Sequence, residues 1–568
     1  MFRTIAGKST FQRTLFDWPI AVFLLTVCIG YWASYDKVAA WNKAWLIVLA
    51  VLLYYALSAQ PRQNLIWVSI IFFLVGISVS VFFFLTHDFS QTPGRLALWW
   101  LHTRPQYGWR AIYHSYVSGV LVITMLVASY GIWQIRTFLL SRHSVLLRLL
   151  FVSGLGIVMG AFLLTSSRGI WLALAAALGI WILWKVITSS RFSAIRRLKS
   201  VFPFIILIYL AMMIFFVYTG PGGPDYSSEQ NVYGSNTRSE LFLRGVFVLE
   251  DVPILGGGLN SFPGLYSQYM LGIPIFYFAN SYNLFLDVAI EQGMVGGLIL
   301  ILLYFGSVWC LSKTIVTTQS AEIRSFSWLS LFTLVVVIIH GMLYDYLYNG
   351  MGVILLLFPL GVSMIGILNA SGENSRPVRI PASGLEQNNA KVISVSVFAV
   401  STVLITLLVT NFNRVRAIWY ANLGVIEMAQ VELAGFPTDK WAESAILPDL
   451  ETAEASFRSA FNFDPINRTA NHRLGLIAML RRDFDSAVEY LEFAHHQTPE
   501  HRGIIKALGY CYVWLGDIDR AQMFLSEIPE AAHELDVYDW WWSDRGRDDL
   551  SANAALMGSR LESATSQP

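Results

Sequence analysis

The amino-acid sequence predicts an all-α, polytopic membrane protein of about 11 transmembrane helices with a large extracytoplasmic loop, followed by an α-helical repeat domain. Three observations predict this class. Of 568 residues, 55% are hydrophobic and only 14% are charged, whereas soluble chains carry about 25% charged residues. Residues 411–568 contain 14 basic and 24 acidic side chains, against 25 and 14 in residues 1–410, which indicates two environments. Finally, the acidic part contains a 34-residue repeat. No basic tract is dense enough to predict nucleic-acid binding.

Residues 1–410 form the predicted membrane domain, because a bilayer needs about 20 apolar residues per helix. Eleven apolar segments meet or approach this length: 18–35, 44–60, 65–86, 111–133, 145–165, 168–188, 200–219, 292–312, 327–345, 350–369 and 392–410. The first has the basic flank of a signal peptide. It is followed by bulky and polar residues, 31–37, without a small-x-small cleavage site, so we expect it to be retained.

Lys and Arg residues in short loops predict the orientation. With the N-terminus inside, most of them fall in inside loops, above all the basic cluster at 191–199, while Lys37 and Lys43 are exceptions. Eleven crossings then place the C-terminal part outside, and one miscounted span would reverse this. The largest outside segment is 220–291, and a loop of this length between spans is commonly functional.

The 34-residue repeat organises residues 411–550. Pro465 recurs at Pro499, and the pair Leu474-Gly475 recurs as Leu508-Gly509. This spacing resembles tetratricopeptide repeats over about 450–530, with a first helix expected at 414–434. Such repeats either bind a partner or only support the membrane domain, and both readings stay open. The same holds for the tryptophans at 540–542, which would cap the last helix or anchor at a membrane. Residues 551–568 are expected to form a flexible tail.

Arg168 is the first candidate catalytic residue. It follows Thr165-Ser166-Ser167 and opens an apolar helix at its outside end. Helix N-terminal amides and guanidinium groups both favour phosphate oxygens. An arginine at a membrane interface is also often only an anchor, so this motif alone does not decide the function.

Further motifs supply the context. Arg238 lies in the large loop before a helical run, and is followed by the turn Pro253-Ile-Leu-Gly-Gly-Gly-Leu-Asn-Ser-Phe262 and then by Asn283-Leu-Phe-Leu-Asp-Val-Ala-Ile-Glu-Gln-Gly-Met-Val-Gly296. With Arg168-Gly-Ile-Trp171, the order and spacing resemble the O-antigen ligase and polymerase family, which includes protein O-oligosaccharyltransferases. The resemblance covers about residues 110–370.

This resemblance implies transfer of a glycan from undecaprenyl diphosphate to an acceptor hydroxyl at the outer face of the bacterial inner membrane. The large loop and the repeat domain would then lie in the periplasm. Arg168 and Arg238 are expected to stabilise the diphosphate leaving group without a metal, and no cofactor is expected. The expected substrate-binding residues on these motifs are Ser167, Asn260, Asn283 and Glu291.

Tyr282 stands where the family has histidine. A tyrosine of ordinary pKa, about 10, is a poorer base than histidine at neutral pH. Tyr282 would take the histidine's role or orient the substrate, or the base would lie elsewhere, at His340, His114 or Asp345. We therefore count Tyr282 and His340 as catalytic candidates, and His114 and Asp345 as residues that line the site.

The favoured interpretation is a polymerase or exopolysaccharide-type transferase, because the family histidine is missing and a repeat domain suits contact with other polysaccharide-assembly proteins. The acceptor would be a glycan, a lipid or a protein, since an O-antigen ligase or a protein O-oligosaccharyltransferase uses the same chemistry. A transporter or flippase of the lipid-linked glycan predicts charged residues within spans and inverted repeats. A non-catalytic receptor predicts that Arg168 and Arg238 are dispensable.

Overall fold

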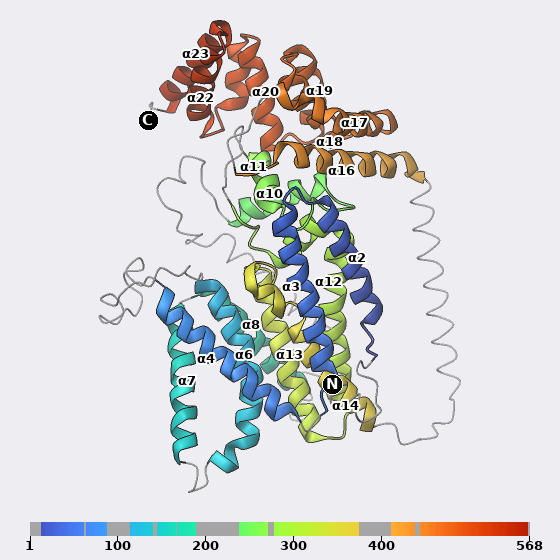
Figure 1. Ribbon diagram of the computed structural model, residues 1–568, viewed down its shortest axis with the longest axis vertical. Helices are drawn as coiled ribbons and strands as arrows, with labels where there is room; N and C mark the ends of the chain where they lie inside the picture. Colours follow the sequence, from blue (N-terminus) through green and yellow to red (C-terminus); the bar gives the residue numbers. More distant parts are fainter. Residues whose placement is uncertain are drawn as a thin grey trace.

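The computed structural model describes residues 13–61, 64–87, 114–139, 145–165, 167–188, 238–270, 278–373, 410–437 and 444–565. These residues form helices joined by turns and contain no strand. Long helices run side by side in the lower part of Figure 1, and the C-terminal helices form a separate layer at one end of them. The all-helical fold that the sequence predicts is thus confirmed.

Nine of the expected spans fall on described residues, and each coincides with a helix or a helix pair. These are α2 (Asp17–Ala33), α3 (Lys37–Ser58), α4 (Leu65–Thr86), α6 (His114–Leu139), α7 (Val145–Thr165), α8 (Arg168–Thr188), α12 (Leu284–Thr317), α13 (Ala321–Gly341), and η5 (Gly350–Leu355) with α14 (Phe358–Glu373). The spans expected at 200–219 and 392–410 lie outside the described residues, apart from Thr410.

Within the described ranges, five helical segments are both long and apolar enough to cross a membrane: α3, α4, α12, α13 and Gly350–Ala370. α7 and α8 meet this test only together, as a pair bent by 109°, which is the geometry of a broken span or a re-entrant loop. α2 and the segment Tyr116–Gly131 of α6 are shorter apolar helices. A multi-pass membrane domain is therefore supported, and the number of about 11 crossings and the orientation stay predictions.

α13 joins two packed groups of helices. Leu334 and Val337 lie in a core shared with α2, α3, α12 and α14. Val336 and Ile339, on another face of the same helix, lie in a core shared with α4, α6, α7 and α8. Much of the apolar surface of α13 is thus covered by other helices. α13 therefore has a central position, and its end carries His340.

The described part of the large loop contains α10 (Arg238–Asp251) and α11 (Phe262–Met270), which lie between the long helices and the C-terminal layer (Figure 1). Phe247 and Tyr266 from this loop share one hydrophobic core with Met428 and Phe457 from the C-terminal layer. The loop and the repeats are thus packed as one unit.

The C-terminal layer consists of paired helices: α16 (Phe412–Glu432), η6 (Ser444–Leu450), α17 (Glu451–Phe463), α18 (Arg468–Leu480), α19 (Phe484–Gln497), α20 (Arg502–Trp514), α21 (Ile518–Leu525), α22 (Ala531–Asp544) and α23 (Asp548–Thr565). In three successive pairs a glycine faces a large side chain. A Cβ atom would lie 2.7 Å from Phe457 at Gly424, 2.7 Å from Leu491 at Gly475, and 2.6 Å from Leu525 at Gly509. The 34-residue repeat therefore reflects helix packing, because the glycine lets the two helices of a pair approach each other closely.

One expectation for this domain is wrong. Residues 551–565 are not a flexible tail but most of α23, which packs against α20, α21 and α22. The reason is a buried stripe at helical spacing, Leu550, Ala554, Met557 and Leu561. Of the three tryptophans, Trp541 and Trp542 are buried in the core of the repeats, and Trp540 is exposed.

Candidate functional site

Three candidate residues stand at the first position of a helix: His114 of α6, Arg168 of α8 and Arg238 of α10. The structure describes their backbone positions and not their side chains. Helix N-termini leave amide groups unpaired and carry a partial positive charge. Ser167 is described and is not helical, so Arg168 stands where an anion is favoured, whereas the residues before Arg238 lie outside the described ranges. Ser167, directly before α8, is buried.

Tyr344 connects the N-terminus of α8 with two other candidates. A Cβ atom at Gly169, the residue after Arg168, would lie 2.6 Å from the Tyr344 ring. The same ring stacks on His340 with 5.1 Å between centroids and meets Tyr282 edge-on at 6.2 Å. The structure thus brings the backbone at Arg168 together with Tyr282 and His340. His340 is fully buried and also contacts Tyr346, at 4.8 Å between ring centroids.

Tyr282 has a strained backbone, with φ of 57°. A bulky residue in this region is a genuine outlier, and such strain clusters at functional sites. The Tyr282 amide donates a hydrogen bond to Asn280 Oδ1 at 3.1 Å, and Asn280 Nδ2 donates to the Tyr116 hydroxyl at 3.3 Å. That hydroxyl in turn donates to Asp345 Oδ1 at 3.4 Å. A chain of polar contacts therefore leads from Tyr282 to Asp345.

Asp345 and Asp287 are both buried. Burial raises the pKa of Asp345 to about 6, because an apolar surrounding disfavours its charge, while the positive charge of Lys43 acts in the opposite direction. Asp287 Oδ1 accepts a hydrogen bond from the Ser281 amide at 2.9 Å, and its Oδ2 atom is buried. A carboxyl group with a pKa near neutrality fits acid–base work.

Two expected substrate-binding residues have partners within the chain. Asn283 caps α12, since its Oδ1 accepts hydrogen bonds from the amides of Phe285 and Leu286 at 3.1 and 3.2 Å. Glu291 forms a buried ion pair with Lys43 at 2.7 Å. The Lys43 ammonium group also lies 3.7 Å from the centroid of the Tyr348 ring, so α3 and α12 are joined by a charged contact.

The glycine-rich motifs on either side of α11 meet each other. α12 is broken at Gly293, which has φ of 74° and ψ of 170°. The break frees the carbonyls of Ile290 and Glu291, which accept hydrogen bonds from the amides of Gly257 and Gly258 at 2.7 and 3.1 Å. A Cβ atom at Gly293 would lie 2.2 Å from the Ile254 carbonyl oxygen. The two motifs therefore pack against each other and are joined by backbone hydrogen bonds.

The same turn is held by neighbours on both sides. Leu259 donates its amide hydrogen to the Gly30 carbonyl at the end of α2. The amides of Ile254 and Leu255 donate to Asn422 Oδ1 of α16 at 3.0 and 2.8 Å. Asn260 follows in the turn with φ of 60° and is half-buried.

A buried polar cluster joins the end of α10 to the repeats. Asp251 Oδ1 accepts hydrogen bonds from Arg468 at 2.6 Å and Thr469 at 2.8 Å, and Oδ2 accepts one from Arg473 at 3.1 Å. Despite its burial, the positive charges of both arginines hold the pKa of Asp251 well below its usual range. Burial lowers the pKa values of His472 and His501, the latter to about 3.

Asp251, His472 and His501 offer ligand atoms within 4.8 Å of one another. A cation there would meet two guanidinium groups that already occupy both carboxylate oxygens of Asp251. Because this cluster is buried, the repulsion would be strong. The cluster is therefore better described as an interface between α10 and the repeats than as a metal centre.

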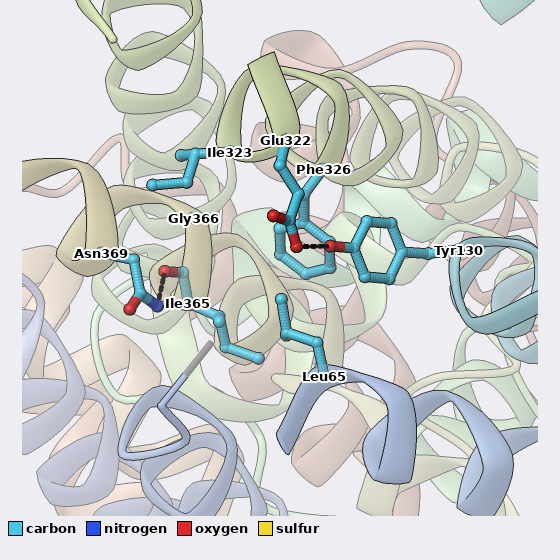
Figure 2. A pocket seen from close by; sticks show the side chains of 8 residues that line it. All are labelled: Leu65, Tyr130, Glu322, Ile323, Phe326, Ile365, Gly366 and Asn369. Atoms are coloured by element: carbon cyan, nitrogen blue, oxygen red, sulfur yellow. Dashed lines mark hydrogen bonds between the residues drawn. The ribbon is translucent and has the colours of Figure 1, made fainter. Parts of the chain in front are cut away.

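A pocket near the other end of α13 is distinct from this site. Figure 2 shows that Tyr130 and Glu322 contact each other across it, with 2.9 Å between the Tyr130 hydroxyl and Glu322 Oε1, while the rest of the lining is mostly apolar. Glu322 and His340 lie 18 residues apart on the same helix, which at 1.5 Å per residue is about 27 Å. This pocket is therefore no part of the candidate site.

Fold and site together define a multi-pass membrane protein whose large loop presents polar residues at helix ends and packs on helical repeats. Residues 152–301 match the family model described as O-antigen ligase, and residues 478–539 match one described as tetratricopeptide repeat. The first match spans Arg168, Arg238, Tyr282 and Glu291, and both predicted resemblances are confirmed. No curated protein and no solved structure gave a significant match. The O-antigen ligase domain indicates a glycosyltransferase or ligase type of enzyme that acts in glycan assembly at a membrane.

Sequence reasoning missed five residues of this network: Lys43, Tyr116, Asn280, Asp287 and Tyr344. A signal existed for two of them. Lys43 contradicts the inward bias of the basic residues, and Asp287 places a carboxyl group on an otherwise apolar helix. The others are ordinary residues whose importance depends on contacts between distant segments.

Proposed function

We propose that the protein transfers or polymerises a glycan from a polyprenyl-diphosphate-linked donor onto an acceptor hydroxyl at the outer face of the bacterial inner membrane, in polysaccharide assembly. The observation that carries this proposal is the meeting of the α8 N-terminus, Tyr282 and His340 around Tyr344. The α8 N-terminus and Tyr282 lie in the segment that matches the O-antigen ligase family, and His340 and Tyr344 follow it in the sequence.

In this proposal Arg168 and Arg238 bind the donor diphosphate and stabilise the charge that develops as the glycosidic bond breaks. Arg168 begins α8 directly after the non-helical Ser167, so backbone amides add to its guanidinium group. Two such groups can supply the electrostatic stabilisation that a divalent cation supplies elsewhere, and we propose a metal-independent reaction. Ser167, Asn260 and His114 would contact substrate, and the buried His340 would fix the Tyr344 ring.

The acceptor would be a growing glycan, a lipid or a protein, and an O-antigen ligase or protein O-oligosaccharyltransferase remains an alternative with the same chemistry. The large loop and the repeat domain would face the periplasm. The repeats would contact other polysaccharide-assembly proteins through surfaces that do not pack on the loop.

One observation favours a transporter of the same lipid-linked glycan, namely the charged residues Lys43 and Glu291 within the apolar helices α3 and α12. These two residues pair with each other and lie within the first eight residues of their helices. Such a pair is typical of an anchored helix end, so we place transport second.

The experiment uses the purified full-length protein with a lipid-diphosphate-linked glycan and an acceptor, and measures released lipid diphosphate. Arg168→Ala and Arg238→Ala should each lower kcat by about 10²- to 10³-fold, as expected for loss of one group that stabilises a developing charge. Arg560→Ala is the matched control, because Arg560 lies on the outer surface of α23 beside the exposed Asp519.

Thermal unfolding of each variant shows whether loss of release reflects loss of the fold. Normal turnover in both arginine variants would contradict the proposal. Facilitated flipping of the lipid without transfer would support the transporter instead. Tyr282→Phe separates two roles, since loss of activity assigns chemistry to the phenol, and full activity leaves it an orienting ring.

A further inference from the structure

We propose that Asp345, supported by Asp287, is the final proton acceptor of the transfer reaction, and that the proton reaches it through the hydroxyl of Tyr116. This inference rests on the proposed function. It supplies the acid–base step that Tyr282, at the position of the family histidine, leaves open.

The contacts form a continuous path. Asn280 and Ser281 immediately precede Tyr282. Ser281 contacts Asp287 directly, whereas Asn280 is linked to Asp345 through Tyr116. The Ser281 amide donates to Asp287 at 2.9 Å, and the Asn280 side chain donates to the Tyr116 hydroxyl at 3.3 Å. The Tyr116 hydroxyl in turn donates a hydrogen bond to Asp345. The short loop of Asn280, Ser281 and Tyr282 is therefore connected to both carboxyl groups.

Tyr116 lies at the centre of this group. Its hydroxyl interacts electrostatically with Asp345, Tyr282 and Asp287. It also stands in the first turn of α6, two residues after His114. A hydroxyl that accepts a proton from one side and donates one to the other can relay it without forming a free phenolate in a buried site.

The balance of charge favours a shared proton. Among the side chains that the structure describes, the ionisable groups around the pair include Lys43 from α3, Tyr116 from α6, Tyr282 before α12, Glu291 and Tyr348 on and beside α12, and His340 at the end of α13. Lys43 is already paired with Glu291 at 2.7 Å.

The partners described for Asp287 and Asp345 are neutral: a Ser281 amide, the Tyr116 hydroxyl and Asn349. The charge of Asp345 is the main electrostatic influence on Asp287. Two buried carboxyl groups of this kind hold one proton between them, because both cannot ionise at low cost. The pair thus carries a single negative charge and can accept one more proton.

A bond forms between the acceptor oxygen and the anomeric carbon, and the bond between that carbon and the donor diphosphate oxygen breaks, with its electron pair passing to the diphosphate. The acceptor proton moves to the Tyr116 oxygen as the Tyr116 proton moves to Asp345. The carboxyl pair then holds two protons, and it returns one to water after the products leave. Asp345 is the acceptor, and Asp287 is a positioning residue that sets its proton affinity.

The test measures lipid-diphosphate release by the full-length protein from about pH 4.5 to 9. Asp345→Asn should lower kcat by about 10²- to 10⁴-fold, the range of general acid–base catalysis, with little change in KM for the donor. Tyr116→Phe should lower kcat in the same direction, because it removes the relay and keeps the ring.

Asp287→Asn gives the distinguishing result. It removes a like charge beside Asp345 and so lowers the pKa of Asp345. Asp345 would then be ionised at lower pH, and the acid limb of the pH–rate profile should shift to lower pH by at least about half a unit. A purely structural role of Asp287 would instead lower the rate equally at every pH. Asp544→Asn, on the exposed end of α22, is the control.

Wild-type kcat in Asp345→Asn, or an unmoved acid limb in Asp287→Asn, would overturn the inference. Should Asp345→Asn fail to fold, Asp287→Asn and Tyr116→Phe decide the matter alone. Failure of the inference leaves Arg168→Ala and Arg238→Ala inactive, whereas failure of the proposed function leaves those two variants as active as wild type. The two outcomes are therefore distinguishable.

Discussion

Replacement of Asp251 by asparagine tests whether the end of α10 joins the large loop to the repeats. Asparagine has the same size and keeps one oxygen acceptor, but it lacks the charge that neutralises Arg468 and Arg473. Both guanidinium groups are buried, with side-chain exposures of 10% and 6%. Removing one partner from a buried ion pair costs about 3–5 kcal/mol, since the other charge stays buried without compensation. We expect Asp251→Asn to lose about this much stability.

The assay is thermal unfolding of the full-length protein in detergent, followed by tryptophan fluorescence, since Trp514, Trp541 and Trp542 lie together in the core of the repeats. For a unit of 150–250 residues, about 2–4 °C per kcal/mol gives a Tm loss of about 6–20 °C. The control Asp544→Asn removes an exposed carboxylate 3.6 Å from Arg545 and should change the stability by under about 1 kcal/mol. A Tm within about 1 °C of wild type for Asp251→Asn would refute the reasoning.

Three further predictions use the same measurement. The free energy of unfolding of the repeat domain should fall by about 2 kcal/mol between pH 7 and pH 5, because the pKa of His501 is about 3 in the folded state and about 6.5 in the unfolded state. This contribution is complete above about pH 6.5 and is lost as the pH falls. His501→Gln should make the stability less dependent on pH. Lys43→Met should cost about 3–5 kcal/mol by leaving Glu291 unpaired, and adding Glu291→Gln should restore most of it; an additive double variant would contradict the pairing. Gly293→Ala should cost at least about 3 kcal/mol through strain and a clash with the backbone, whereas Gly156→Ala, with open space around it, should be neutral.

The elements that depend on local pattern could be predicted from the sequence. Nine expected spans coincide with helices because a continuous apolar run specifies a helix by itself. Asp483 and Asp517 cap α19 and α21, the position that aspartate favours, each accepting a hydrogen bond from an amide three residues ahead. The recurrence of Gly475 at Gly509 likewise predicts the close helix contact that the structure contains.

The elements that depend on contacts between distant segments could not be predicted. Lys43 and Glu291 are 248 residues apart, and Asp251 and Arg468 are 217 apart. In neither pair does the sequence around one residue indicate which distant residue it contacts. The motif Glu291-x-Gly293 could be recognised as a pattern, but its physical reason is the break in α12 and the turn that fills it. Similarly, Tyr282 could be noted as a departure, and its positive φ and its link to Tyr116 could not.

The position of α10 bears on whether the repeats support the membrane domain or recruit a partner. Arg238 begins this helix and Asp251 ends it, so a contact that fixes Asp251 also fixes the start of the helix 13 residues away. Arg468 and Arg473 of α18 supply that contact, and Asn422 of α16 holds the turn that follows α10. By contrast α21, α22 and α23 pack with α19 and α20 in a core made of repeat residues. The two roles therefore divide along the array: the helices near the loop hold the arginine that we propose to bind diphosphate, and the later helices present the surface available to a partner.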